Sequence, residues 1–271
     1  MTRPSLRLRI PRSLILLQVL LLGSVLPDAG RAQQIQGVGD APAPGQRVVL
    51  VTGSTGGLGR EVARALAADG AHVILHGRSE GRAAELLQEI RAGGTGSARF
   101  YRADFASLDQ VRGLADAVLR DYPRLDALVN NAGIALIGDP ERRLSEDGYE
   151  LHLQVNYLAG YLLTRLLLPR LQESAPARIV NVSSIGQAPP DFDDLMLESG
   201  YDTGRAYGQS KLAQILFTFD LAESLGDSGV SVNALHPATL MDTEMVRDAG
   251  VRPRATVEEG RDALLRLVVE P

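Results

Sequence analysis

The stretch "RVVLVTGSTGGLGREVARALAADG", residues 47–70, joins an apolar run to a glycine-rich segment and then to an amphipathic one. The run "RVVLVT" is rich in β-branched residues and lacks polar alternation, which is typical of a strand buried on both faces. In the third part, Val62, Ala65 and Leu66 share one helical face, and Gly70 marks its end. The stretch therefore predicts a strand, a glycine-rich turn and a helix.

The same alternation continues along the chain. The runs "HVILHG", "ARFYRAD", "LDALVNNAG", "ARIVNVSS" and "VSVNALHP" predict five further strands, and the longest helices between them are predicted over about 145–173 and 205–226. Strands that alternate with helices form a parallel sheet covered on both faces, with right-handed crossovers. The predicted fold class is α/β: a Rossmann-type, doubly wound parallel sheet in a single domain, residues 47–271.

Composition narrows the classes of function. The 271 residues include no cysteine, which excludes disulfides, thiolate zinc sites and cysteine nucleophiles. Residues 1–32 hold five arginines and one aspartate, so the remainder carries 23 basic and 32 acidic groups, a net charge of −9. An acidic body argues against nucleic acid as a partner, because phosphate binding needs a cationic surface. The four histidines, His72, His76, His152 and His236, lack metal-ligand spacing, so packing or surface roles and no metal are predicted.

The N-terminal region has the order of a targeting segment. Arginine-rich "MTRPSLRLRIPRS" precedes the apolar run "LILLQVLLLGSVL", and the small residues Gly30 and Ala32 follow. This order predicts a secretory signal peptide over residues 1–32, and the apolar run is shorter than the roughly 20 residues of a membrane-spanning helix. An uncleaved anchor, or a start codon assigned too far upstream in a cytoplasmic protein, is the alternative. Residues 33–46, "QQIQGVGDAPAPGQ", predict a flexible linker.

The glycine-rich turn predicts a phosphate site. Gly53, Gly57 and Gly59 permit a tight turn and the close approach of a pyrophosphate, and the following helix N-terminus offers free N–H groups. The second strand ends at Arg78 rather than at an acidic residue, and a guanidinium can hold a ribose 2′-phosphate with two hydrogen bonds. NADP(H) is therefore the predicted cofactor, with NAD(H) as the alternative because Glu80 lies close by.

The segment "YGQSK", residues 207–211, contains the only lysine of the chain. Tyr207 and Lys211 lie one turn apart on one helix face. A phenol titrates near 10, and an ammonium about 4 Å away could lower its pKa by as much as roughly three units, although desolvation opposes this. Lysine is also a compact charge that can reach ribose hydroxyls. The pair predicts acid–base catalysis by Tyr207 near neutral pH.

These motifs resemble those of the short-chain dehydrogenase/reductase family. "TGSTGGLG", "NNAG" (130–133), "NVSS" (181–184), "YGQSK" and "HPATLMDT" (236–243) occur in the family's order, from Arg47 onward. "RIVNVSS", a long insert and then "AYGQSKLAQILFTFDLA" most resemble the retinol-dehydrogenase-like branch. The resemblance implies an NAD(P)-dependent oxidoreductase that acts on a small apolar carbonyl or alcohol, and a homo-oligomer.

The resemblance also implies roles for individual residues. Tyr207 would act as acid and base with help from Lys211, Ser184 would hydrogen-bond the substrate oxygen, and Asn156 would hold a proton-relay water. Asp104 would cap the adenine amino group. The implied cofactor-binding residues are Gly53, Ser54, Thr55, Gly57, Leu58, Gly59, Arg78, Asp104, Phe105, Asn131, Ala132, Gly133, Tyr207, Lys211, Pro237 and Thr239.

The end of the chain departs from the family pattern. Ala238 stands where a glycine is usual, and the threonine of that loop comes one residue late, at Thr243. Only 35 residues follow His236, and no seventh strand is recognisable among them. One expectation is therefore a sheet that lacks its C-terminal strand, and a truncated or non-catalytic NADP-binding protein is the alternative to an enzyme. An exported structural or binding protein is a third interpretation.

Overall fold

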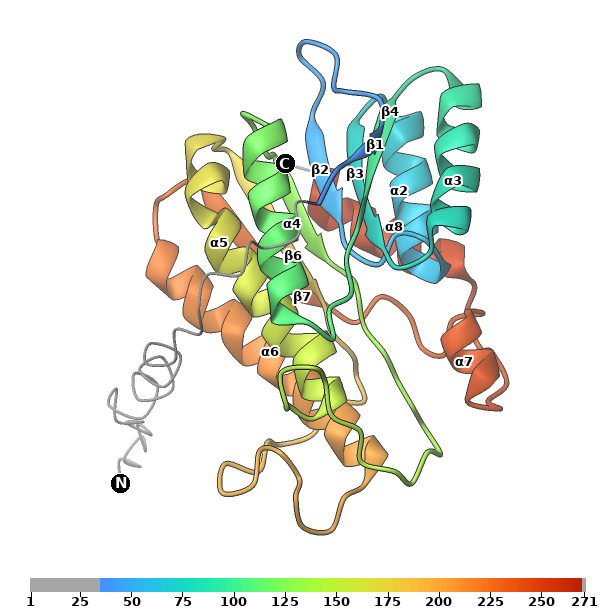
Figure 1. The fold of residues 1–271 in the computed structure, drawn as a ribbon, viewed down its shortest axis with the longest axis vertical. Helices are drawn as coiled ribbons and strands as arrows, with labels where there is room; N and C mark the ends of the chain where they lie inside the picture. Colours follow the sequence, from blue (N-terminus) through green and yellow to red (C-terminus); the bar gives the residue numbers. More distant parts are fainter. Residues whose placement is uncertain (1–34, 270–271) are drawn as a thin grey trace, which may run out of the picture. The chain divides into compact units, whose positions relative to one another are not determined.

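The computed structural model describes residues 35–269, so the predicted signal peptide or anchor over residues 1–32 lies outside the described part. Its core is a seven-stranded sheet in the order β1-β4-β3-β2-β5-β6-β7 (Figure 1). The strands are β1 (Val38–Gly39), β2 (Val48–Val51), β3 (His72–Gly77), β4 (Ser97–Arg102), β5 (Ala127–Asn130), β6 (Ala177–Val182) and β7 (Val230–Leu235). Strands β2 to β7 are parallel, which confirms the six predicted strands and the doubly wound α/β fold.

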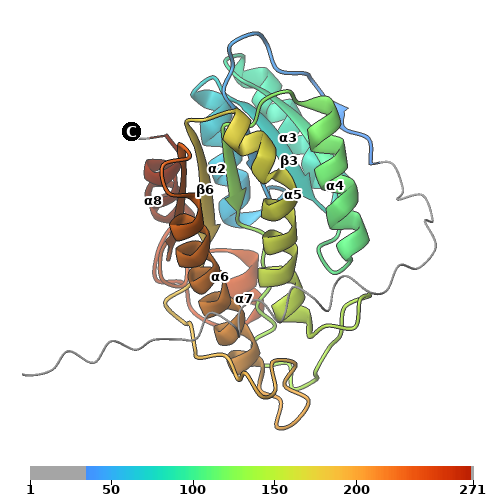
Figure 2. The ribbon, with the colours of Figure 1, turned by 90° about the vertical axis from the view of Figure 1, so that its left-hand side faces the viewer.

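Helices cover both faces of the sheet. They are α2 (Gly57–Ala68), α3 (Glu80–Gly93), α4 (Leu108–Asp121), η2 (Leu153–Leu158), α5 (Ala159–Glu173), α6 (Thr203–Leu225), α7 (Glu244–Asp248) and α8 (Val257–Val269). Helices α4, α5 and α6 pack on one face, and α2, α3 and α8 pack on the other (Figures 1 and 2). The two layers explain why the central strands are apolar along their whole length.

The first parallel strand shows how the apolar pattern is used. In β2, Val48 and Leu50 belong to the core cluster beneath α4 and α5, whereas Val49 and Val51 belong to the cluster beneath α2 and α3. All four side chains are buried. Full burial of such side chains contributes about 1.5–3 kcal/mol each, so β2 stabilises both layers of the fold.

The segment predicted as a flexible linker contains an ordered edge strand. Val38 lies opposite Phe100 in an antiparallel pair, and the Asp40 N–H donates to the carbonyl of Ala98 (3.0 Å). The Asp40 carboxylate also pairs with Arg91 (3.2 Å). The linker prediction is therefore wrong at these positions. A segment without apolar periodicity is held here because the edge of β4 offers backbone hydrogen bonds.

The long helix predicted from about residue 145 begins later, at Leu151. Gly148 adopts a left-handed φ of 81° in a turn in which the Ser145 N–H donates to the Tyr149 carbonyl (2.8 Å). The Glu150 carboxylate then accepts the Leu153 N–H (2.8 Å) and caps the new helix. Residues 153–158 form a π-helical turn, a feature found frequently at functional sites.

Helices rather than a strand follow β7 in the described residues. Helix α8 buries Leu264 and Val268 in the cluster shared with α2 and the end of β6. Within residues 35–269, β7 is thus an edge of the sheet. No helix among these residues is both long enough and apolar enough to cross a bilayer.

Candidate active site

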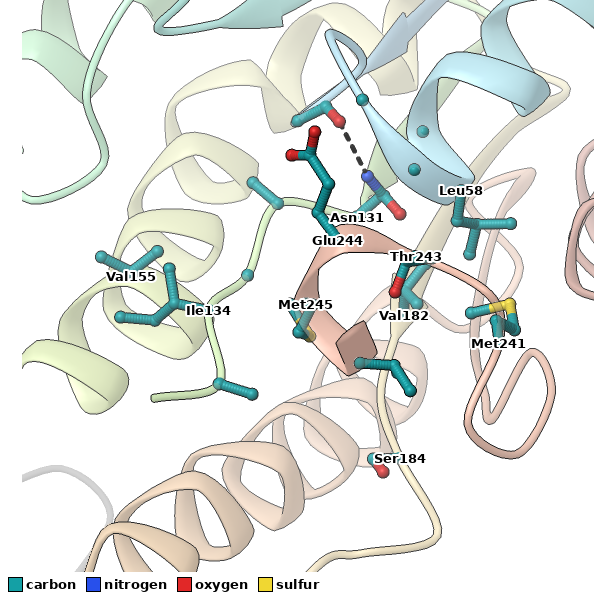
Figure 3. Close-up of a pocket in the computed structure, with 18 of the residues that line it drawn as sticks. Leu58, Asn131, Ile134, Val155, Val182, Ser184, Met241, Thr243, Glu244 and Met245 are labelled. Carbon is teal, nitrogen blue, oxygen red and sulfur yellow. Dashed lines mark hydrogen bonds between the residues drawn. The ribbon is translucent and has the colours of Figure 1, made fainter. Parts of the chain in front are cut away.

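A pocket of about 740 Å³ lies at the carboxyl ends of the parallel strands (Figure 3). The loops after all six of these strands contribute to it, because the carboxyl ends of parallel strands meet at one edge of the sheet. The sheet order reverses between β2 and β5, and doubly wound sheets bind ligands at such a reversal.

Most residues predicted for the site line this pocket. They are Gly53, Thr55, Gly57, Leu58, Gly59, Arg78, Asp104, Phe105, Asn131, Ala132, Gly133, Ser184, Tyr207, Lys211, Pro237 and Thr239. Ser54 and Asn156 are outside the lining. Ser54 is fully buried, and its Oγ accepts the N–H of His76 (2.9 Å). Asn156 lies behind the pocket wall, where its amide bonds Ile134 and Ser210.

The glycine-rich loop needs its glycines for close packing. Gly53 has a left-handed φ of 65°, and a Cβ on it would lie 2.9 Å from the Cα of Ala132. A Cβ on Gly59 would lie 2.4 Å from the Gly53 carbonyl oxygen. The Asn131 amide donates to that carbonyl (3.3 Å) and so ties the loop to the segment after β5 (Figure 3).

His76, predicted to be a packing or surface residue, supports this loop. Its Nδ1 accepts the Gly53 N–H (3.2 Å), and its Nε2 is 3.1 Å from the carbonyl of Ala103, so Nε2 carries the proton. The ring stacks on Phe105 with centroids 4.3 Å apart. Burial lowers the pKa of His76 to about 4, which keeps the ring neutral at pH 7. Only its place at a strand end could have indicated this role in the sequence.

Two arginines belong to the lining of the pocket. Arg78 is exposed, and its guanidinium is 3.7 Å from the Asp104 carboxylate. Arg82, which the sequence analysis did not single out, also lines the pocket and donates two hydrogen bonds to Glu244 (2.7 and 2.9 Å). Glu244 projects from the start of α7 (Figure 3). This ion pair therefore links α3 to α7 beside the glycine-rich loop.

Tyr207 and Lys211 lie on α6, and Ser184 follows the end of β6. Lys211 is 5% exposed, and its Nζ donates to the Val182 carbonyl (2.9 Å) and to Gln214 (3.1 Å). Burial lowers the pKa of Lys211 to about 8. The Nζ atom is 5.7 Å from the centroid of the Tyr207 ring.

The expected lowering of the tyrosine pKa by the lysine is wrong for this structure. Burial raises the pKa of Tyr207 above its usual value, and a hydrogen bond with Ser184 opposes that rise. The ammonium of Lys211 is directed to Val182 and Gln214, and burial disfavours the ionised phenol. Tyr207 is consequently protonated at neutral pH.

A family model described as "short chain dehydrogenase" matches residues 47–252, more than half of the chain. The chain belongs to the short-chain dehydrogenase family. This is a family of NAD(P)-dependent oxidoreductases, and the curated relatives of this chain place it in the retinol-dehydrogenase-like branch.

Two of these relatives are mouse proteins. The chain is 39% identical to retinol dehydrogenase 13 of Mus musculus over 90% of its own length and 74% of that protein. It is 42% identical to retinol dehydrogenase 14 of Mus musculus, over 76% of this chain and 65% of that protein. Among solved structures, a metagenomic short-chain oxidoreductase in complex with NADP has a TM-score of 0.66 and 27% identity, over 83% of this chain and 91% of that chain.

The loop after β7, residues 236–243, is the one in which the sequence departs from the family pattern. Its threonine, Thr243, lies near the glycine-rich loop. Leu240 adopts a left-handed φ of 50°, which is rare for a residue with a side chain, and the backbone turns there. The methyl group of Thr243 lies 3.4 Å from the position of a Cβ on Gly57. Thr243 accordingly lines the pocket beside the glycine-rich loop.

Proposed function

We propose that this short-chain dehydrogenase transfers a hydride between NADP(H) and an apolar aldehyde, ketone or alcohol. The observation that carries the proposal is the meeting of Tyr207, Ser184 and Lys211 in one pocket with the glycine-rich loop. The oxidoreductase family and the NADP complex of a structural relative support it.

The residues present fit a dinucleotide. Among the described residues no side chain caps the N-terminus of α2, so its first N–H groups and the tight loop before it offer a site for a pyrophosphate. Arg78 and Arg82 would hold a 2′-phosphate, since guanidinium groups bind phosphate with paired hydrogen bonds. Asp104 would receive the adenine amino group, and Lys211 would reach the ribose hydroxyls.

When bound, the nicotinamide would supply or accept the hydride. Tyr207 holds a proton at Oη at neutral pH, since an ordinary phenol has a pKa near 10 and burial raises the pKa of Tyr207 further, and it would give this proton to the carbonyl oxygen of the substrate. Ser184 lies beside it, with its Oγ accepting the Gly186 N–H (3.0 Å), and its hydroxyl would orient the same oxygen. Alcohol oxidation would run these steps in reverse.

The pocket mouth favours an apolar substrate. Ile137, Ile185 and Met245 line it and are 49%, 71% and 37% exposed, so their apolar surface would be covered by a bound substrate. Two relatives at about 40% identity carry the name retinol dehydrogenase, and retinol is a long apolar alcohol. We infer that a long apolar alcohol or its aldehyde is the substrate class.

The test mixes the purified full chain with NADPH and each of three substrates, all-trans-retinal, decanal and cyclohexanone. The consumption of NADPH is measured by its absorbance. We expect turnover with the long aldehydes, its loss in Tyr207→Phe, and unchanged NADPH binding by fluorescence. Tyr161→Phe is the matched control, because Tyr161 packs on Phe217 outside the pocket. NADPH binding without turnover by the unmodified protein would favour the alternative, a non-catalytic NADP-binding protein.

The signal peptide or anchor over residues 1–32 is proposed from the sequence alone. N-terminal sequencing of the expressed protein tests it. A new terminus at residue 33 would support a cleaved signal, and an intact Met1 would support an anchor or a cytoplasmic protein.

A further inference from the structure

A fully buried acid–histidine pair lies behind the proposed substrate pocket. Glu150 and His152 are each 0% exposed, with the His152 Nδ1 and a Glu150 carboxylate oxygen 2.9 Å apart. The carboxylate also accepts the Leu153 N–H (2.8 Å) and the hydroxyl of Tyr201 (3.3 Å). Burial alone would raise the pKa of Glu150, but the hydrogen bonds from His152 and Leu153 outweigh it and lower the pKa. The pair is therefore a carboxylate and an imidazole held at fixed positions.

The carboxylate fixes which nitrogen of His152 carries the proton. Because Nδ1 donates to Glu150, Nε2 is the acceptor, and it receives the Leu136 N–H (3.1 Å). Leu136 lies within the segment after β5, and its neighbours Ile134, Ala135 and Ile137 line the pocket. His152 thus holds this wall from behind.

The same wall is bonded to the helix that carries Tyr207. The Thr203 hydroxyl donates to the Leu136 carbonyl (2.9 Å), and Tyr207 follows one turn later on α6. The rings of His152 and Tyr207 meet edge to face, with centroids 6.5 Å apart at 88°. Leu136 is therefore bonded through its N–H to His152, and its carbonyl accepts both the Thr203 hydroxyl and the Asp139 N–H (3.0 Å).

The cofactor side of the segment is held independently. The Thr52 hydroxyl accepts the N–H groups of both Asn131 and Ala132 (2.9 Å each). Ile134 is held separately by two hydrogen bonds with the Asn156 amide (2.8 and 3.1 Å). Loosening the bonds at Leu136 would therefore move residues 135–137 without releasing Ile134 or the residues beside the glycine-rich loop.

We propose that His152, oriented by Glu150, is a positioning residue that fixes the pocket wall 135–137 relative to Tyr207. The inference rests on the proposed function of this site. A substrate held by a misplaced wall reacts slowly, since a shift of about 1 Å can reduce a rate by about a hundredfold. This positioning role differs from simple packing, because it requires a hydrogen-bond acceptor at the place of the His152 Nε2 atom, opposite the Leu136 N–H.

The test compares His152→Leu with His152→Gln. Leucine fills the space but offers no acceptor to Leu136, whereas the amide oxygen of glutamine can replace Nε2. We expect kcat with all-trans-retinal to fall at least about tenfold in His152→Leu and to recover largely in His152→Gln, with the NADPH dissociation constant changed by less than about twofold in both. Equal losses in the two variants, or a loss of NADPH binding as large as the loss of kcat, would overturn the proposal.

Amide hydrogen exchange of residues 133–140 measures the wall without any substrate. Exchange at Leu136 should accelerate in His152→Leu and not in His152→Gln, and unchanged protection would contradict the role of His152. This measurement tests the inference separately from the proposed function. If the unmodified protein shows no turnover, the proposed function is contradicted, but the exchange rates at Leu136 still test the role of His152.

A milder variant covers the case in which His152→Leu does not fold. Thr203 is half-buried, and Thr203→Val removes the hydrogen bond that its hydroxyl donates to the Leu136 carbonyl. This variant should lower kcat at least about threefold. Thr95→Val is the matched control, since the Thr95 hydroxyl donates to the Ala68 carbonyl (3.1 Å) before β4, outside the pocket. Equal kcat in these two variants would also overturn the proposal.

Discussion

Replacing Lys211 with methionine tests the electrostatics of the buried site through folding stability. Burial lowers the pKa of Lys211 from 10.5 to about 8. At about 1.4 kcal/mol per pKa unit, a charged lysine at this position disfavours folding by about 3 kcal/mol relative to a neutral one. Methionine has a similar length and no charge, so it removes this penalty at the same time as the hydrogen bonds of Nζ.

The sign of the pH dependence follows from the direction of the shift. Below pH 8 the lysine is protonated in both the folded and the unfolded protein, so the whole penalty is present. Between about 8 and 10.5 the folded protein loses its proton first, and the penalty disappears as the pH rises. The unmodified protein should therefore gain about 2 kcal/mol over Lys211→Met between about pH 7 and 9.5.

The assay is urea unfolding of both proteins at several pH values in this range. Arg64→Met is the control, because the exposed Arg64 keeps its charge throughout and its effect on the free energy of unfolding should not change with pH. A difference between Lys211→Met and the unmodified protein that stays constant across the range would refute the reasoning. It would mean that Val182 and Gln214 fully compensate the buried charge.

Two further predictions concern cofactor choice. Arg78→Asp should weaken NADPH binding at least about tenfold and NADH binding less than about threefold, because an acid repels a 2′-phosphate, and an equal loss for both in fluorescence titrations would remove Arg78 from that role. Glu244→Gln should tighten NADPH binding by about two- to fivefold with little effect on NADH, because it releases the Arg82 guanidinium, and this gain should shrink at high salt. No change in titrations at low salt would show that the ion pair does not compete with the phosphate.

The sequence predicted the sheet well because its strands are buried on both faces. Short apolar runs such as residues 47–52, separated by helical segments, indicate strands buried on both faces. All six predicted strands are present. The strand β1 was missed because its two residues are held by the edge of β4 and not by any pattern of their own. The helix start near residue 145 was misplaced because a turn at Gly148 and a capping Glu150 intervene.

The residues predicted from motifs mostly line the pocket. The side chains that hydrogen-bond the pocket loops and hold them in place could not be recognised from the sequence. His76 and His152 looked alike as isolated histidines, yet each accepts a backbone N–H from a different pocket loop. Those bonds join residues 23 and 16 positions apart along the chain, so only the tertiary structure brings them together. Asn156 illustrates the reverse case, since a motif residue proves to hold the wall at Ile134.

The sequence offers two reasons for a lysine at position 211, a charge that makes Tyr207 acidic and a proton that can take part in a relay, and the structure supports only the second. The sequence suggested a charge that makes Tyr207 acidic, but burial raises the pKa of the phenol and lowers that of the amine. An arginine would stay charged at every working pH, whereas an amine with a pKa of about 8 can lose or regain its proton close to neutrality. Two of its three N–H donors are directed to Val182 and Gln214, and a third is available to the pocket that Lys211 lines. The lysine therefore combines a fixed anchor in the protein with a proton that can be exchanged, and an arginine cannot offer both.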